Sequence, residues 1–106
     1  MSYGMIATWR MACDGIAAAT QALAEGGSSQ KAIVDAIKMV EDYPFYKSVG
    51  YGGLPNEVGM VERDAAFMNG DNFDIGAVAG SRSVKNPIVV AEKLSHERFN
   101  SFLVGD

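Results

Sequence analysis

Three glycines stand within four residues near the middle of the chain, in the stretch Ser48-Val-Gly-Tyr-Gly-Gly-Leu-Pro-Asn-Glu57. Glycine is favoured where a backbone takes a positive φ or packs closely against another segment. The stretch matches neither the G-x-G-x-x-G pattern of dinucleotide sites nor a lysine-containing P-loop, and a strand-like run follows it where those sites need a helix. We therefore expect Gly50, Gly52 and Gly53 to have structural roles and not to bind phosphate.

Two helical patterns precede this glycine-rich stretch. Apolar residues recur at helical spacing between Met11 and Glu25, and Gly26-Gly27 supplies a left-handed stop. A second helix is expected to begin at a capping serine, at position 28 or 29, and to end before Pro44, because the residue before a proline is disfavoured in a helix.

Four segments have the composition of strands. Arg63 to Met68 and Phe73 to Ala79 are joined by Asn69-Gly70-Asp71-Asn72, which is typical of a hairpin loop. Tyr3 to Trp9 predicts a first strand and Phe102 to Val104 a last one. The apolar runs of the two middle strands are nearly continuous, which indicates burial on both faces.

A third helix is predicted from Asn86-Pro87, where the asparagine caps and the proline takes the first helical position, to about Arg98. The resulting order is strand, helix, helix, strand, strand, helix, strand. This order predicts an α/β or α+β layered fold, with a sheet covered by helices. With 106 residues, of which 48% are apolar, we expect residues 1–106 to form a single domain. The unguarded last strand suggests a partner chain or a continuation.

Charge and composition exclude several classes of protein. The formal charge is -4 and no basic run is present, which argues against a nucleic-acid surface. No segment has the length of a membrane span or the pattern of a signal peptide, so we expect a cytoplasmic protein. The single cysteine, Cys13, excludes an internal disulfide and a cysteine-rich zinc site.

Two sets of carboxylates could attract a cation. Glu62, Asp64, Asp71 and Asp74 offer oxygen ligands, but their spacing does not match a calcium loop, and solvent-facing charge is the simpler interpretation. Glu41-Asp42 ends the second helix, where the helix dipole disfavours carboxylates. A monovalent cation or Lys47 could offset them, and we favour Lys47 or solvent. We predict no metal site.

The remaining chemical candidates are a cysteine-histidine pair and the sole tryptophan. Cys13 and His96 lie on different predicted helices without an orienting acid, so we expect a small buried cysteine and a helix-end histidine. Trp9 stands where a strand passes to a helix, a position at which layered sheets place ligands. Its position alone fits a core plug equally well.

The ordered motifs resemble the N-terminal part of glycosylasparaginases, which belong with isoaspartyl peptidases and plant-type asparaginases among the N-terminal nucleophile hydrolases. The resemblance covers nearly the whole chain and rests on these segments: Thr8-Trp9, the alanine-rich helix closing in Gly26-Gly27, Ser48 to Glu57, Asp64 to Gly70, Gly76-Ala-Val78, Lys85-Asn-Pro-Ile88 and Leu103-Val-Gly-Asp106. The start Gly4-Met-Ile-Ala-Thr-Trp9 is closer to the glycosylasparaginase branch than to the His-Gly-Gly-Ala-Gly start usual in the plant-type branch.

This resemblance implies a four-layer αββα sandwich whose precursor cuts itself into α and β subunits. A threonine at the start of β would attack the side-chain amide of an asparagine derivative, with its own α-amine as base and no cofactor. Trp9 would contact the substrate, and Ser48 would lie near the amine of the nucleophile. The glycines after Ser48 would let the backbone pack against this centre.

The resemblance also implies that the catalytic nucleophile lies in a β subunit or continuation beyond residue 106. Thr8 and Thr20 are not N-terminal and cannot replace it. We therefore expect these residues alone to be inactive, as one part of an N(4)-(β-N-acetylglucosaminyl)-L-asparaginase-like amidohydrolase. Two alternatives are an oligomerising interaction module derived from such an enzyme, and a small-ligand binder that stacks ligands on Trp9.

Overall fold

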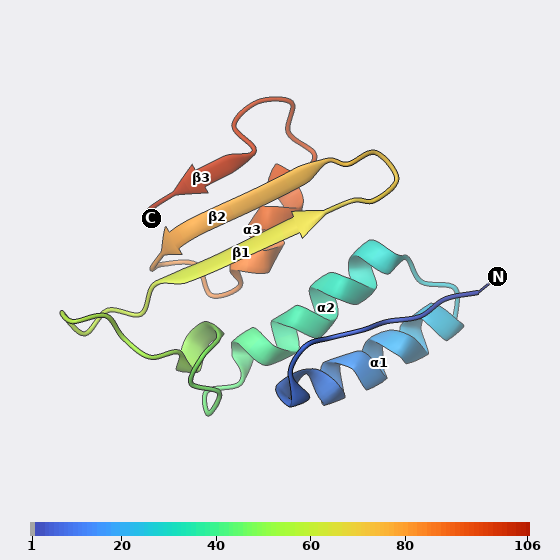
Figure 1. The fold of residues 1–106 in the computed structure, drawn as a ribbon, viewed down its shortest axis with the longest axis horizontal. Coiled ribbons are helices and arrows are strands. Elements are labelled where there is room, and N and C mark those ends of the chain that lie inside the picture. Colours follow the sequence, from blue (N-terminus) through green and yellow to red (C-terminus); the bar gives the residue numbers. More distant parts are fainter. Residues whose placement is uncertain (1) are drawn as a thin grey trace.

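The computed structural model describes residues 2–106, and two groups of elements lie side by side in it (Figure 1). One group is a helix pair and the other is a small sheet with a helix on one face. The elements are the helices α1 (Cys13–Ala24), α2 (Ser29–Asp42) and α3 (Pro87–Leu94), the strands β1 (Arg63–Met68), β2 (Ile75–Ser81) and β3 (Phe102–Val104), and the short 3-10 turns η1 (Arg10–Ala12) and η2 (Gly50–Gly52). This mixture of helices and sheet is compatible with the predicted α/β class.

The sheet has the order β1-β2-β3. β1 pairs with β2 in antiparallel orientation, with Ala66 opposite Ala77, and β2 pairs with β3 in parallel orientation, with Val78 opposite Leu103. The predicted bounds of β1 and β3 are confirmed. β2 begins two residues later than predicted, because Phe73 takes a φ of 62° in the connecting loop, and it extends to Ser81.

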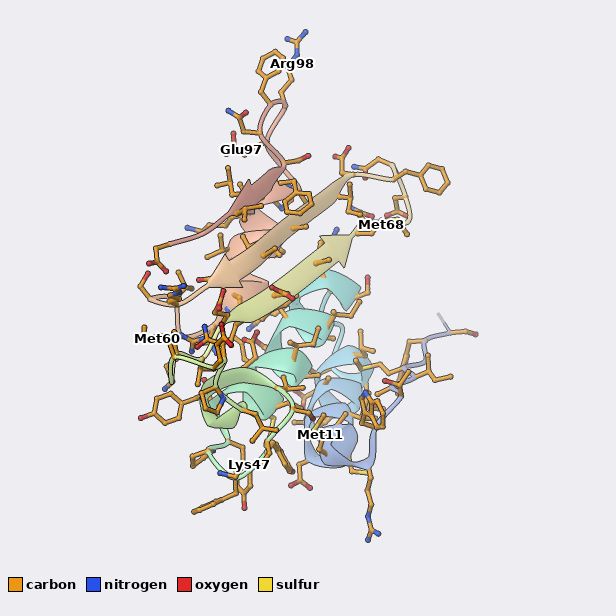
Figure 2. All side chains as sticks on the ribbon, turned by 60° about the vertical axis from the view of Figure 1, so that its left-hand side comes forward. Met11, Lys47, Met60, Met68, Glu97 and Arg98 are labelled. Atoms are coloured by element: carbon orange, nitrogen blue, oxygen red, sulfur yellow. The ribbon has the colours of Figure 1, made fainter. Side chains whose placement is uncertain are left out.

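One face of the sheet packs on α3 and the other is exposed. Phe67 of β1 forms a core cluster with Ile88 and Ala91 of α3. On the opposite face, Met68, labelled in Figure 2, is paired with Ile75, and the two residues remain 55% and 53% exposed. The prediction of burial on both faces is therefore wrong for this structure, because the cluster of Phe67 with α3, against which Val34 and Ile37 of α2 also pack, covers one face of the sheet only.

The helix pair has its own small core. Ala19 of α1 and Ala32 and Ala36 of α2 are buried together, and small side chains let the two helices approach closely. Gly15 shows how close this approach is, because a Cβ there would lie 2.7 Å from the carbonyl oxygen of Ala36. α2 also contacts α3, so it connects the helix pair to the sheet.

The predicted first strand, Tyr3 to Trp9, is wrong. This segment runs along the helix pair without a strand assignment, and the side chain of Ile6 is 96% exposed (Figure 1). Its composition favours an extended backbone, but a strand also needs a hydrogen-bonded neighbour. None of the described strands pairs with this segment.

The helix ends follow local signals with two exceptions. Ser28 caps α2 by accepting a hydrogen bond from the backbone N–H of Lys31 at 3.2 Å, and α2 ends at Asp42, ahead of Pro44, as predicted. The residues before Cys13 form η1 instead of the first turn of α1. α3 ends at Leu94, four residues before the predicted Arg98. Within residues 2–106, no helix combines the length and apolar character that a bilayer crossing needs.

Candidate active site

The glycine-rich stretch folds tightly over the C-terminal end of α2. Gly50 has a φ of 67°, and a Cβ at this position would lie 2.4 Å from both the Cα and the carbonyl oxygen of Glu41. A Cβ at Gly52 would lie 2.2 Å from the carbonyl oxygen of Pro44, whereas Gly53 has looser surroundings, with its nearest atom at 3.1 Å. The loop therefore rests directly on backbone at Gly50 and Gly52, where no side chain fits.

Ser48, at the start of this loop, lines a polar cavity of about 220 Å³. The cavity wall also includes Glu41 from α2 and Arg63 and Asp64 from β1. Ser48 is exposed in the described residues. The cavity thus brings a hydroxyl, carboxylates and a guanidinium to one place.

Glu41 is the most deeply buried charged side chain of this cavity, with 2% of its surface exposed. One carboxylate oxygen accepts a hydrogen bond from the backbone N–H of Ile88 at 3.2 Å, and the other accepts from Nδ2 of Asn86 at 3.1 Å. Burial raises the pKa of Glu41 above its ordinary value of 4.5, although the hydrogen bonds from Asn86 and Ile88 partly oppose this shift.

Two predictions about this region are corrected by these contacts. The side chain of Asn86 does not cap α3, because it donates instead to Glu41 and, at 2.8 Å, to Asp42. Lys47 forms no ion pair with either carboxylate in the described part of the chain, and Figure 2 places it in the loop after α2. The cation near Asp42 is Lys85, at 3.8 Å. The start of α3 thus offsets the carboxylates at the end of α2.

The raised pKa of Glu41 predicts how stability depends on pH. A carboxyl group whose folded pKa exceeds its unfolded value binds more protons in the folded state, so the free energy of unfolding falls as pH rises through the interval between the two values. This interval begins near 4.5 and extends upward. Glu41→Gln should therefore flatten the decline above that pH, as measured by urea unfolding at a series of pH values. Asp42→Asn, which changes an exposed carboxylate on the same Asn86, should flatten the decline less than Glu41→Gln, because the charge of Asp42 is a smaller cause of the raised pKa of Glu41 than burial is. An unchanged slope in Glu41→Gln would contradict the prediction.

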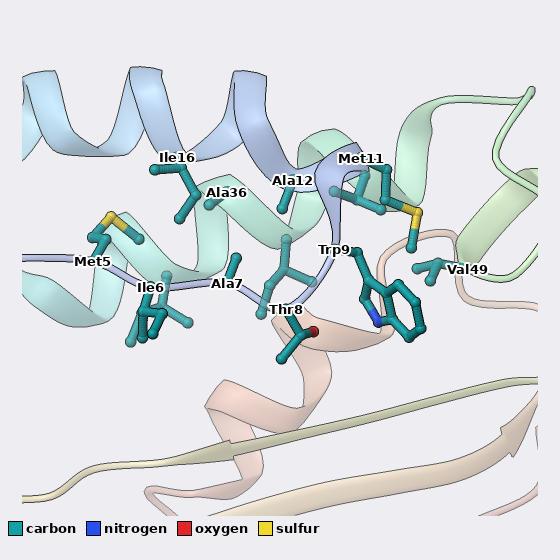
Figure 3. Close-up of a pocket in the computed structure, with 13 residues that line it drawn as sticks. Met5, Ile6, Ala7, Thr8, Trp9, Met11, Ala12, Ile16, Ala36 and Val49 are labelled. Carbon is teal, nitrogen blue, oxygen red and sulfur yellow. The ribbon is translucent and has the colours of Figure 1, made fainter.

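Trp9 lines a second, mostly apolar cavity of about 370 Å³, between the N-terminal segment and the helix pair. Figure 3 shows its indole beside Val49, which lines both cavities and follows Ser48 in the chain. The indole is 69% exposed, so Trp9 does not plug the core of the described residues. Trp9 and Ser48 therefore lie on neighbouring cavities that share one wall residue.

The other candidate residues do not gather into a site. Cys13 is exposed at the start of α1, so the expectation of a buried cysteine is wrong. His96 follows α3 and pairs with Glu92 at 2.7 Å. Glu62 pairs with Asn56 and lies 3.9 Å from Arg82, and Asp64 accepts from the backbone of Gly80. In residues 2–106, no three histidine, cysteine or acidic side chains are grouped to hold a metal ion.

The link between Glu41 and α3 was not predicted from the sequence. One signal could have indicated it, because Glu41 follows Ile33 and Ile37 at helical intervals of eight and four residues and so shares the apolar stripe of α2. A carboxylate on such a stripe must find hydrogen-bond donors when it is buried. The partners themselves, 45 and 47 residues later, have no local signal.

Comparison with known proteins identifies the family. A family model described as Asparaginase matches residues 6–106. The chain is 37% identical over 102 residues to an N(4)-(β-N-acetylglucosaminyl)-L-asparaginase of Elizabethkingia miricola. The matched residues are 96% of this chain and 30% of that protein. It is 42% identical over 89 residues to the protein of the same name from Rattus norvegicus, covering 84% of this chain and 26% of that protein.

A plant-type L-asparaginase of Pyrococcus horikoshii is 44% identical over 80 residues, which are 76% of this chain and 26% of that protein. The chain thus spans less than a third of the length of these relatives. Because the family match covers nearly every residue, the chain belongs to the asparaginase family.

Proposed function

We propose that this chain is the N-terminal α portion of a glycosylasparaginase-like amidohydrolase. The substrates would be asparagine derivatives with a side-chain amide, namely aspartylglucosamine, β-aspartyl peptides or asparagine. The observation that carries the proposal is the match of residues 6–106 to the family, together with relatives named N(4)-(β-N-acetylglucosaminyl)-L-asparaginase. The complete enzyme would need the continuation that such relatives have.

In the proposed reaction, an N-terminal threonine outside these residues attacks the carbonyl carbon of the side-chain amide. Its α-amine takes the hydroxyl proton and passes it to the leaving amine, and water then hydrolyses the acyl-enzyme ester to release aspartate. Trp9 would form a wall of the substrate pocket, because its exposed indole stands at the rim of an apolar cavity. Ser48 would hydrogen-bond the amine of the nucleophile from the neighbouring polar cavity.

The exposed apolar surface supports the proposal that a further part of the enzyme packs against these residues. Met68, Ile75 and Phe102 remain more than half exposed on the three strands of the sheet, and Tyr3 to Trp9 has no strand partner in the described residues. Apolar surface of this kind is usually covered by another element. We propose that the β portion covers it and completes a four-layer αββα sandwich, in which residues 1–106 form one domain of an oligomeric cytoplasmic enzyme.

The test is aspartate release by the complete, self-cleaved protein from aspartylglucosamine, a β-aspartyl dipeptide and asparagine. We expect release from at least one of them, and none after the threonine that starts the β portion is replaced by valine. Trp9→Ala should reduce kcat/KM by up to about tenfold, which corresponds to the loss of one aromatic contact. Tyr3→Ala is the matched control, since Tyr3 is an exposed aromatic residue of the same segment that does not line the cavity of Trp9. No release from any of the three substrates would refute the proposal.

A further inference from the structure

The carboxylate of Glu41 joins α2 to the first turn of α3. α3 begins at Pro87, and the backbone N–H of its second residue, Ile88, donates to Glu41 at 3.2 Å. Free N–H groups at a helix start need acceptors, and a negative charge there is favoured by the helix dipole. A side chain from one helix therefore caps another, while Asn86, which precedes α3, turns its amide toward the same carboxylate at 3.1 Å.

The backbone of Glu41 also supports the loop that contains Ser48. Gly50 lies so close to it that a Cβ would approach the Cα of Glu41 to 2.4 Å. Ser48 stands two residues before this contact and lines the same cavity as Glu41 and Pro87. The position of the serine and the position of α3 are thus both set relative to one residue.

The position of the Glu41 carboxylate also affects Arg63. It lines the same cavity, and its buried Nε has no hydrogen-bond partner within residues 2–106. Its positive charge acts on Glu41, which lies across the cavity at the end of α2. A shift of Glu41 would therefore disturb the loop, the start of α3 and the charged start of β1 together.

We propose that Glu41 is a positioning residue, whose carboxylate fixes the position of the loop from Ser48 to Gly53 relative to the start of α3. Without this carboxylate, Ser48 no longer stands at a fixed place beside the pocket. The catalytic consequence rests on the proposed function, since it assumes that Ser48 contacts the amine of the nucleophile. The positional consequence does not depend on it.

Hydrogen exchange of the complete protein tests the positional consequence. Glu41→Ala should speed amide exchange both at Ile88 and in the segment from Ser48 to Gly53. Glu41→Gln should speed exchange less than Glu41→Ala, because its amide oxygen can still accept from Ile88, although its NH2 group then faces the Nδ2 donor of Asn86. Asp42→Ala is the matched control, because the exposed Asp42 accepts from the same Asn86 at 2.8 Å but does not reach the backbone of α3.

Two results would overturn the positional consequence. One is faster exchange at Ile88 with an unchanged loop after Glu41→Ala, and the other is an equal effect of Asp42→Ala. If Glu41→Ala does not fold, Glu41→Asp replaces it in the test. Glu41→Asp should also speed exchange at Ile88 and from Ser48 to Gly53, because it keeps the charge but moves the carboxylate away from Ile88 by one methylene.

Kinetics of the complete enzyme test the catalytic consequence. Glu41→Asp should lower kcat by about tenfold and leave KM within about twofold, because it acts on the nucleophile and not on substrate binding. In a Ser48→Ala background the same substitution should cause no further loss, since residues that act through each other are not additive. Independent, additive losses would overturn this role. A wild-type enzyme without turnover would refute the proposed function, and hydrogen exchange would still decide the positional role.

Discussion

Gly76→Ala is expected to lower the free energy of unfolding by about 3 kcal/mol or more, which is at the upper end of the cost of overpacking a core. Gly76 lies in β2 against the backbone of α3. A Cβ at this position would lie 2.1 Å from the carbonyl oxygen of Ala91 and 2.4 Å from the backbone nitrogen of Ser95. Backbone atoms of a helix cannot rotate away as a side chain can, so the sheet and the helix would have to separate.

The cost of this separation falls on the main core of the sheet. Ile88 and Ala91 are 1% and 0% exposed, and they pack with Phe67 under β1. Moving α3 outward would open a gap along these contacts, and a gap of less than one atom already loses much of the dispersion energy. Urea unfolding of wild-type and variant protein measures the effect.

Gly70→Ala is the control for the loss of a glycine itself. Gly70 lies in the loop between β1 and β2, without a positive φ, and a Cβ there would meet no atom within 4 Å. We expect a change within about 0.5 kcal/mol, as for an ordinary surface substitution. If Gly76→Ala were no more destabilising than Gly70→Ala, the result would contradict a close approach of β2 to the backbone of α3 at Gly76.

The elements that the sequence predicts well are those with local signals. The bounds of β1 follow from a short apolar run ahead of the turn-forming residues at 69–72, and α2 lies between a capping serine and Pro44. Each of these signals involves residues within a few positions of one another. These elements can therefore be predicted from short stretches of the sequence.

Two of the predictions that were wrong depend on partners far away in the sequence. Tyr3 to Trp9 has the composition of a strand, but strand formation depends on a neighbour that these residues cannot specify. Asn86 has the right type and position for a cap, yet it is drawn to two carboxylates more than 40 residues earlier. Local propensity ranks the options for a segment, and tertiary contacts then select among them.

The residues of the candidate site also fall into those that the sequence indicates and those that only the structure reveals. Trp9 was a candidate from its position between a strand-like and a helical segment, which fitted a ligand contact and a core plug equally well, and the resemblance to a family favoured the first; Ser48 was selected through the resemblance alone. The structure adds Val49, which lies between the two cavities, and Glu41, which is buried at the end of α2. Their roles were not predicted because they follow from how the loop folds back on α2, and the apolar stripe of α2 indicates at most that Glu41 is buried, not which residues it contacts.

Gly50→Ala is expected to affect both stability and activity, because two costs coincide at this residue. Its φ of 67° is in the left-handed region, which costs a residue with a Cβ about 1–2 kcal/mol. The added Cβ would also meet the Cα and carbonyl oxygen of Glu41 at 2.4 Å. Since that backbone is held in α2, the loop would have to move instead, and it would displace Ser48 from its place two residues earlier.

Gly26→Ala separates these two costs. Gly26 has a φ of 91° after α1, but a Cβ there would meet no atom within 4 Å, so only the conformational cost applies. We expect Gly50→Ala to exceed Gly26→Ala by about 2 kcal/mol in urea unfolding, the usual scale of overpacking. In the complete enzyme, Gly50→Ala should also reduce kcat for aspartate release, whereas Gly26→Ala should leave it unchanged. Equal losses of stability would show that the loop does not rest on Glu41, and full activity in Gly50→Ala would remove the link between that contact and the position of Ser48.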